Sequence, residues 1–336
     1  MSQDRKDEEI YNELMKETIS IMNEQSLTDA GQAKIVQTGK NMARITTVLL
    51  SVAFLLMIFP LLLLSSYVYY AVGGKATTLM DVVSKTIYVT EPNVSVEEME
   101  FEQTIGVFSM KLDFDLFKKI GNEEYNIGDE NIQFDFSAPR FPKKHLHLDR
   151  PLPEIPVREN EILFHPKVPL QYDPKIEWTK LKGLPDETMS EAYVSLSSVM
   201  NKKDLQSALP PKVELRWLAV DTGIEEEQIG EKWNPYTALG YPAQVDTTTW
   251  SPFNGREQTN EEVFVDILRF LEGYEDEVTK LARAKVMSIK ERRQYVEKKG
   301  IKVYGAVVTG PTSEIRKLEA MKEVRAVKLG EVKLWN

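Results

Sequence analysis

The residues that could carry out chemistry are few in this chain. Its 336 residues include no cysteine, which excludes disulfides, cysteine-ligated zinc, iron–sulfur clusters and thiol catalysis. The three histidines, His145, His147 and His165, lie in one proline-rich passage that also holds Asp149. A His-x-His pair with a third histidine can ligate zinc. Because no further ligand-type spacing accompanies them, we favour exposed loop histidines over a zinc site.

Two further patterns could bind a ligand. The acidic run at residues 223–231 could hold Ca²⁺, but its oxygens are not spaced as in an EF-hand loop, so we interpret it as a solvated acidic turn. Trp217, Trp233 and Trp250 could line a pocket, although aromatic residues in strand patterns more often belong to the core. Because GxSxG, HExxH, SxxK and phosphate-loop motifs are also missing from the sequence, we predict no enzyme activity and no cofactor.

The charge and hydropathy are unevenly distributed. The 42 Lys+Arg against 52 Asp+Glu leave a net charge of −10, which argues against a nucleic-acid partner, since phosphate contacts need a basic face. The mean hydropathy is −0.33, yet no charged residue occurs from Ile45 to Val72. This combination is typical of a soluble protein tied to a membrane.

The uncharged segment at residues 45–72 predicts one transmembrane helix. It would be about 42 Å long at 1.5 Å per residue, enough to cross a hydrocarbon core of about 30 Å. Pro60 divides it into pieces too short to span separately, so a kink is favoured over two spans. A signal peptide would begin much closer to the N-terminus. Three basic residues precede the span closely and two follow it, which favours a cytoplasmic N-terminus and an extracytoplasmic C-terminal part.

The segment before the span contains an amphipathic pattern. Its apolar residues recur at three- and four-residue steps, which predicts a helix with one apolar face. The cytoplasmic part is too short to bury that face within its own fold. The polar face is acidic, unlike that of most helices that lie on a membrane, so we favour a protein partner. The predicted contact residues are Ile10, Tyr11, Leu14, Met15, Ile19 and Met22.

The sequence after the predicted span indicates an α+β fold. Residues 86–137, beginning with TIYVT at 86–90, are β-rich, and eight prolines make residues 138–176 an extended connector. We predict a short cytoplasmic helical tail, one transmembrane helix, a β-rich juxtamembrane region, a proline-rich connector and an extracytoplasmic α+β domain. The predicted boundaries are 1–44, 45–72, 73–137, 138–177 and 178–336.

The last part of the chain contains an internal repeat of pattern. Residues 191–223 and 301–334 both read strand, short helix, strand, so we predict a sheet of at least four strands like a split βαβ or ferredoxin-like fold. Ile315 and Leu318 fall on one face of the second helix. Between the two units lies a helical region, for which Thr259 to Glu262 has the spacing of a capping box and Gly300 is placed to end the last helix.

The motifs resemble those of a known family. VYGAVVTGPTSEIRKLEAMKEVRAVKLGEV, at the C-terminus, is similar to the closing motif of the sigma-factor-regulator C-terminal domain of membrane-bound anti-sigma factors in Gram-positive bacteria. LPDETMSEAYVSL (184–196), WLAVDTG (217–223) and ALGYP (238–242) fall where that domain has earlier signatures. YYAVGGKATTLMDVVSKTIYVTEPNV (69–94) resembles the family's N-terminal region.

The resemblance implies an anti-sigma factor that holds an extracytoplasmic-function sigma factor at the membrane and releases it on an envelope signal. The chain departs from zinc-containing anti-sigma domains, because their His-x-x-x-Cys-x-x-Cys motif is impossible without cysteine. The expected partners are the sigma factor and the lipid bilayer, with a second membrane regulator left open and no nucleic acid. A membrane-anchored extracytoplasmic enzyme and a structural surface protein remain the alternatives.

Overall fold

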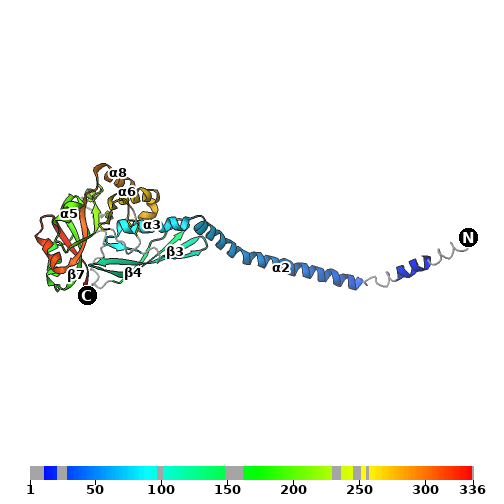
Figure 1. Cartoon of the computed structure of the whole chain (residues 1–336). Helices are drawn as coiled ribbons and strands as arrows, with labels where there is room; N and C mark the ends of the chain where they lie inside the picture. The colour runs from blue at the N-terminus through cyan, green and yellow to red at the C-terminus, as the bar shows by residue number, and fades with distance from the viewer. Residues whose placement is uncertain are drawn as a thin grey trace. The chain divides into compact units, whose positions relative to one another are not determined.

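The protein has a mixed helix and sheet structure, as the sequence predicted (Figure 1). The computed structural model describes residues 11–20, 29–96, 101–147, 162–228, 236–244, 251–254 and 257–334. Residues 1–62 and 63–336 form two separate units, and we describe each by itself.

The first unit is helical where it is described. Residues 11–20 form one helix, and α2 (Asp29–Tyr67) begins with an acidic residue in its first turn. The stretch from Asp29 to Val72 is long and apolar enough to cross a membrane. Pro60 lies inside α2 without ending it, so one helix forms rather than a hairpin of two.

In the second unit, the end of α2 is followed by the π-helical turn η1 (Val68–Val72) and helix α3 (Lys75–Thr90). The predicted strand TIYVT at residues 86–90 is wrong, because this segment is the last part of α3. All five of its side chains are buried, and burial outweighs the weak helix propensity of β-branched residues. Thr86 and Thr90 donate their hydroxyls to carbonyls one turn back, at 2.6 and 2.7 Å, which satisfies them inside the core.

The first sheet is the predicted β-rich region. Its long strands β3 and β4 pair antiparallel, with β1 and β2 on the β3 side and β5 and β6 on the β4 side. Burial alternates residue by residue along β3, so one face of the ribbon packs inward. The strands are β1 (Val94–Ser95), β2 (Glu102–Gly106), β3 (Ser109–Ile120), β4 (Glu123–Asp135), β5 (Ala138–Pro139) and β6 (Lys143–Leu146).

The described parts of the proline-rich passage are packed against the rest of the unit. Strands β5 and β6 extend the first sheet. Ile162, Leu163 and Phe164 are buried, and α4 (Pro174–Gly183) starts with proline in its first turn and Asp173 as its N-cap.

The second sheet contains both predicted strand–helix–strand segments. Its antiparallel order is β11-β7-β10-β8-β9, so the strands of one segment interleave with those of the other, as in a split βαβ arrangement. The second helix is shorter than expected, four α-helical residues followed by a 3₁₀ turn, but Ile315 and Leu318 are fully buried. The elements are β7 (Thr188–Met200), α5 (Lys202–Ala208), β8 (Glu214–Val220), β9 (Gly240–Pro242), β10 (Val303–Pro311), α9 (Thr312–Ile315), η6 (Arg316–Ala320) and β11 (Val324–Leu334).

A helical region separates the two segments. Thr259 and Glu262 form the predicted capping box, in which each side chain bonds the other residue's backbone N–H. Gly300, at φ 77°, ends the last helix as expected. The elements are η4 (Glu225–Gln228), α6 (Asn260–Leu271), η5 (Glu272–Tyr274), α7 (Glu275–Leu281) and α8 (Ile289–Lys299).

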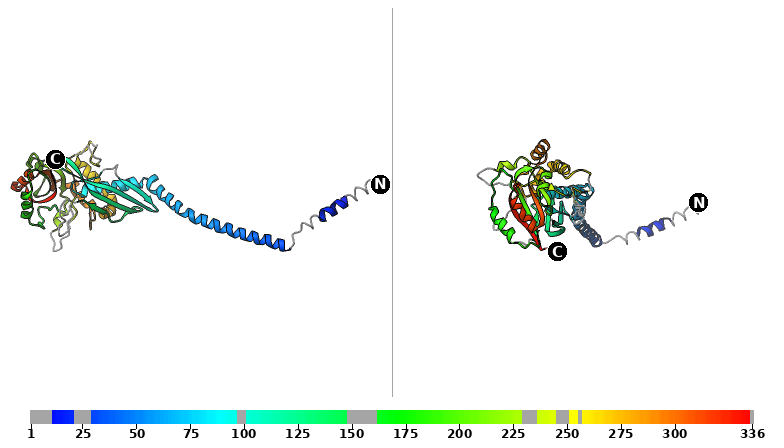
Figure 2. Two further views of the ribbon diagram at one scale, coloured as in Figure 1. Left: turned by 90° about the horizontal axis from the view of Figure 1, so that it is seen from below. Right: turned by 60° about the vertical axis from the view of Figure 1, so that its left-hand side comes forward.

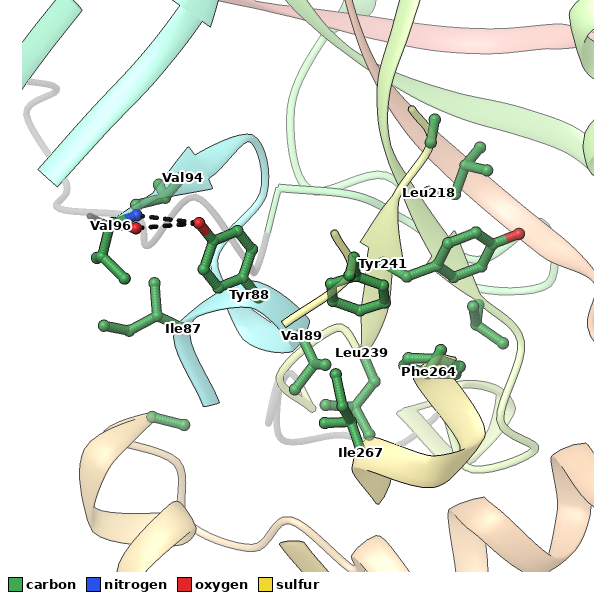
Figure 3. Close-up of a cluster of buried hydrophobic side chains, with 14 of the residues drawn as sticks. Ile87, Tyr88, Val89, Val94, Val96, Leu218, Leu239, Tyr241, Phe264 and Ile267 are labelled. Carbon is green, nitrogen blue, oxygen red and sulfur yellow. Dashed lines mark hydrogen bonds between the residues drawn. The ribbon is translucent and has the colours of Figure 1, made fainter. Parts of the chain in front are cut away.

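One hydrophobic core joins both sheets and these helices. Figure 2 shows the sheets and helices of the second unit from two further sides. Figure 3 shows part of it, where Val89 of α3 lies beside Leu239 and Ile267 and the Tyr88 ring faces Val94 and Val96. The Tyr88 hydroxyl is not left unpaired there, because it donates to the carbonyl of Val96 at 3.1 Å. Helix α3, which follows the apolar segment directly, is therefore part of the core of the second unit.

Candidate functional site

The predicted contact residues on the N-terminal helix lie on one exposed face. Tyr11, Leu14, Met15 and Ile19 are between 47% and 64% exposed. Their three- and four-residue spacing places them on one side of the helix at residues 11–20. Ile10 and Met22 lie outside the described residues.

Local bonds support this helix. The Thr18 hydroxyl donates to the Leu14 carbonyl at 2.6 Å, and the Ser20 hydroxyl donates to the Glu17 carbonyl at 3.1 Å. Glu13 and Glu17 give the helix acidic charge away from the centre of the apolar face. An exposed apolar stripe with this spacing suits docking into a groove of another protein.

The three histidines are not brought together. His145 and His147 are exposed as predicted, and His145 pairs with Asp129 at 3.1 Å. The interpretation of His165 as an exposed loop histidine is wrong, because the residue is only 4% exposed and lies against the ring of Tyr304. Burial lowers its pKa, so the neutral imidazole is favoured. Asp149 lies outside the described residues.

The acidic run contains a buried ion pair. Glu225 accepts from the backbone N–H and hydroxyl of Thr222 and pairs with Arg292 at 3.0 Å. Both charged side chains are closed to solvent, so the interpretation of a solvated turn is wrong at Glu225. The arginine comes from α8, 67 residues further along the chain, which local sequence could not indicate.

Trp217 belongs to the core and also lines a cleft. Its indole N–H donates to the carbonyl of Tyr88 at 3.0 Å. The signature segments WLAVDTG and ALGYP pair here as β8 and β9, with Ala219 opposite Gly240. A side chain at Gly240 would collide with the Trp217 ring, which explains the glycine.

Trp233 and Trp250 lie outside the described residues. The cleft is lined in part by Asn93, Ser95, Lys119 and Arg216.

A buried polar cluster, which we did not predict from the sequence, joins the two sheets. Lys118 of β3 pairs with Glu191 of β7 at 3.0 Å and donates to the Tyr193 hydroxyl at 2.8 Å. Asn93 donates to the other carboxylate oxygen of Glu191 at 2.8 Å. The side chains of Lys118 and Glu191 are at most 1% exposed.

A sequence signal for Lys118 did exist. The apolar positions of β3 are Met110, Leu112, Phe114 and Leu116, and the same two-residue step continues to Lys118. A lysine on the inward face of a strand needs a buried acceptor. Strand alternation could therefore have predicted a buried charge, but not which carboxylate would pair with it.

Two regions of the chain match known protein families. Residues 33–125 match the family described as sigma factor regulator N-terminal, and residues 181–331 match sigma factor regulator C-terminal. Lys118 thus comes from the first matched region and Glu191 from the second. No solved structure matches the chain.

A relative covers nearly the whole chain. The protein named probable anti-sigma-M factor YhdL, from Bacillus subtilis (strain 168), is 30% identical over 335 residues, which are 98% of this chain and 90% of the relative. With both regulator regions present in order, the chain belongs to the sigma factor regulator family of anti-sigma factors.

Proposed function

We propose that the chain is a single-pass membrane anti-sigma factor that sequesters an extracytoplasmic-function sigma factor. Residues 1–44 lie in the cytoplasm and hold the sigma factor away from RNA polymerase. Residues 73–336 lie outside the membrane and respond to an envelope signal that releases it. The role is one of binding, which agrees with a family whose members are regulators.

The observation that carries this proposal is the exposed apolar face at Tyr11, Leu14, Met15 and Ile19. Among the described residues of the first unit, nothing covers these side chains. A partner that buries them gains the free energy of removing apolar surface from water. The sigma factor is the partner that the family supplies.

The apolar stretch within Asp29–Val72 supports the membrane location. Lys34, Lys40 and Arg44 precede the uncharged segment, against Lys75 and Lys85 after it, which favours a cytoplasmic N-terminus. This orientation puts the exposed helix in the compartment that contains RNA polymerase.

The test is to purify the detergent-solubilised full chain from its native cells and identify what co-elutes. We expect a sigma factor in stoichiometric amount, reduced with Leu14→Asp and retained with Ser20→Asp, which adds the same charge on the opposite face. Protease added outside wall-stripped cells should degrade residues 73–336 and spare the N-terminal segment. Protection of the large fragment, or the absence of any sigma factor, would overturn the proposal in favour of an enzyme or a surface protein.

A further inference from the structure

Two turns at one end of the first sheet carry exposed phenylalanines. Phe108 lies in the turn between β2 and β3, and Phe136 lies in the turn between β4 and β5. The backbone N–H of Phe136 donates to the carbonyl of Phe108 at 3.0 Å, and the two rings stack with centroids 5.3 Å apart. The residues are 39% and 51% exposed, so the stacked pair leaves much apolar surface uncovered. We call this pair the tip.

The backbone at the tip is unusual for phenylalanine. Phe108 has φ 52° and Phe136 has φ 55°, in the left-handed region that favours glycine. Glycine would fit both turns without strain. The chain instead places a bulky apolar side chain at each strained and exposed position, which points to a use for the side chains themselves.

The tip is bonded directly to the end of the apolar helix. The Ser66 hydroxyl accepts from the backbone N–H of Phe108 at 2.7 Å, and the Tyr70 hydroxyl donates to the carbonyl of Phe136 at 2.8 Å. The Tyr69 hydroxyl lies 3.0 Å from that of Ser137. Figures 1 and 2 show the end of the β3–β4 ribbon where β3 starts and β4 finishes, at the start of the second unit. All these residues belong to that unit.

The neighbouring residues continue the aromatic surface. The ring of Tyr69 meets that of Phe136 edge-on at 5.9 Å, and Tyr67 is 55% exposed. Aromatic rings with a polar atom favour the boundary between lipid headgroups and hydrocarbon, where these tyrosines would lie if residues 45–72 cross the membrane. The bonds from Ser66 and Tyr70 fix the tip at the same level.

We infer that the tip is a second membrane contact, with Phe108 and Phe136 inserted into the lipid interface beside the end of the span. This inference rests on the proposed single-pass topology. The exposed ring of Phe136 adjoins Tyr69 of the apolar segment within the second unit, so the occupant is the bilayer itself. With a single helix as its only membrane contact, the second unit could rotate about the helix axis. The tip, as a second contact, holds the first sheet against the membrane.

The absence of cysteine from the sequence gives a clean test. Single variants Phe108→Cys and Phe136→Cys of the full chain receive a nitroxide label and are reconstituted in vesicles of phosphatidylcholine and phosphatidylglycerol. Spin-relaxation enhancement by oxygen, which partitions into lipid, is compared with that by a water-soluble nickel chelate. Ile176→Cys, an exposed apolar position on α4, is the matched control, and Leu56→Cys reports on the span.

We expect the labels at residues 108 and 136 to favour oxygen, as the label at residue 56 does, and the label at residue 176 to favour the chelate. If residues 108 and 136 favour the chelate while residue 56 favours oxygen, the tip inference fails and the span stands. If residue 56 itself favours the chelate, the proposed topology fails. An immobilised label shielded from both agents would show a protein contact and would also overturn the inference.

A glycine variant separates membrane contact from folding. Phe108→Gly with Phe136→Gly suits the left-handed backbone, so the thermal unfolding of the full chain in detergent should keep its midpoint. A label on Val107→Cys in this background should lose its preference for oxygen in vesicles. Retention of that preference would show that the phenylalanine side chains do not hold the tip in lipid.

Discussion

The ammonium of Lys118 lies 3.0 Å from the carboxylate of Glu191, and neither side chain reaches solvent. The lysine comes from the first sheet and the glutamate from the second, so the pair crosses the boundary between them. Removing one member of a buried pair leaves an uncompensated charge in the core. The stability of each sheet therefore depends on the other.

Lys118→Met should destabilise the second unit by about 3–5 kcal/mol, because Glu191 would remain buried without its cation. The measurement is urea unfolding of the full chain in detergent. Lys111→Met is the matched control, since Lys111 lies on the same strand with a half-exposed ion pair that contributes at most about 1 kcal/mol. Adding Glu191→Gln to Lys118→Met should recover part of the loss. Equal effects at residues 111 and 118 would contradict the buried charge.

The isolated fragment 178–336 tests the coupling of the sheets. Because it contains both strand–helix–strand segments, the sequence predicts that this fragment folds alone. In the structure, however, it would lose three contacts, namely Lys118 to Glu191, Tyr88 to Trp217 and the cover of Leu163. We expect the fragment to unfold at a lower urea concentration than residues 73–336. Coincident unfolding curves would show that the second sheet needs none of these contacts.

Local patterns predicted much of this fold. The capping box at Thr259, the glycine end at Gly300 and the two strand–helix–strand segments follow from short-range rules, and all are present. The strand predicted for TIYVT is wrong, because β-branched residues favour strands only by a small margin. Burial of this segment as part of α3 decides its conformation.

Pairings across the chain could not be predicted in this way. Glu225 looked solvated because its cation, Arg292, lies 67 residues away, and His165 looked exposed because its cover comes from β10. Of the candidate site, the exposed face of the N-terminal helix was readable, since three- and four-residue spacing is local. The tip could not be predicted from the sequence, because it is formed by two turns and a helix end that meet only in the folded unit.

Ile315→Asp or Leu318→Asp should destabilise the second unit by about 3 kcal/mol or more, because both side chains are fully buried beneath the second sheet. Thermal unfolding of the full chain in detergent measures the loss. Lys317→Asp, on the exposed side of the same turn, should change stability by no more than roughly 0.5 kcal/mol. An unchanged melting temperature for both buried variants would refute the packing of this turn.

The stability of the second unit should fall between about pH 4.5 and about pH 7. Burial raises the pKa of Glu130 to about 7, with Lys144 opposing the shift and Glu91 adding to it. The folded state therefore binds the proton more tightly than the unfolded state. Protonated Glu130 stabilises the folded state fully below the pKa of the unfolded state, about 4.5. This stabilisation, at most about 3 kcal/mol, is lost as the pH rises through 7. Glu130→Gln should flatten this slope in melts at about pH 5 and about pH 8, whereas Glu102→Gln, exposed on β2, should not.

Leu14→Asp should weaken binding of the sigma factor. Leu14 lies in the middle of the exposed apolar face, and a buried anchor in a helix-binding groove can contribute about 2 kcal/mol or more, which corresponds to roughly 30-fold in affinity. Titration of the detergent-solubilised chain with the purified sigma factor measures this change.

Acidic Glu13 and Glu17 should favour a basic patch on the partner, so that affinity falls as salt rises. In cells, the same variant should switch on the sigma-dependent genes, while Ser20→Asp should leave repression intact. If Leu14→Asp binds and represses like the wild type, the contact lies elsewhere in residues 1–44.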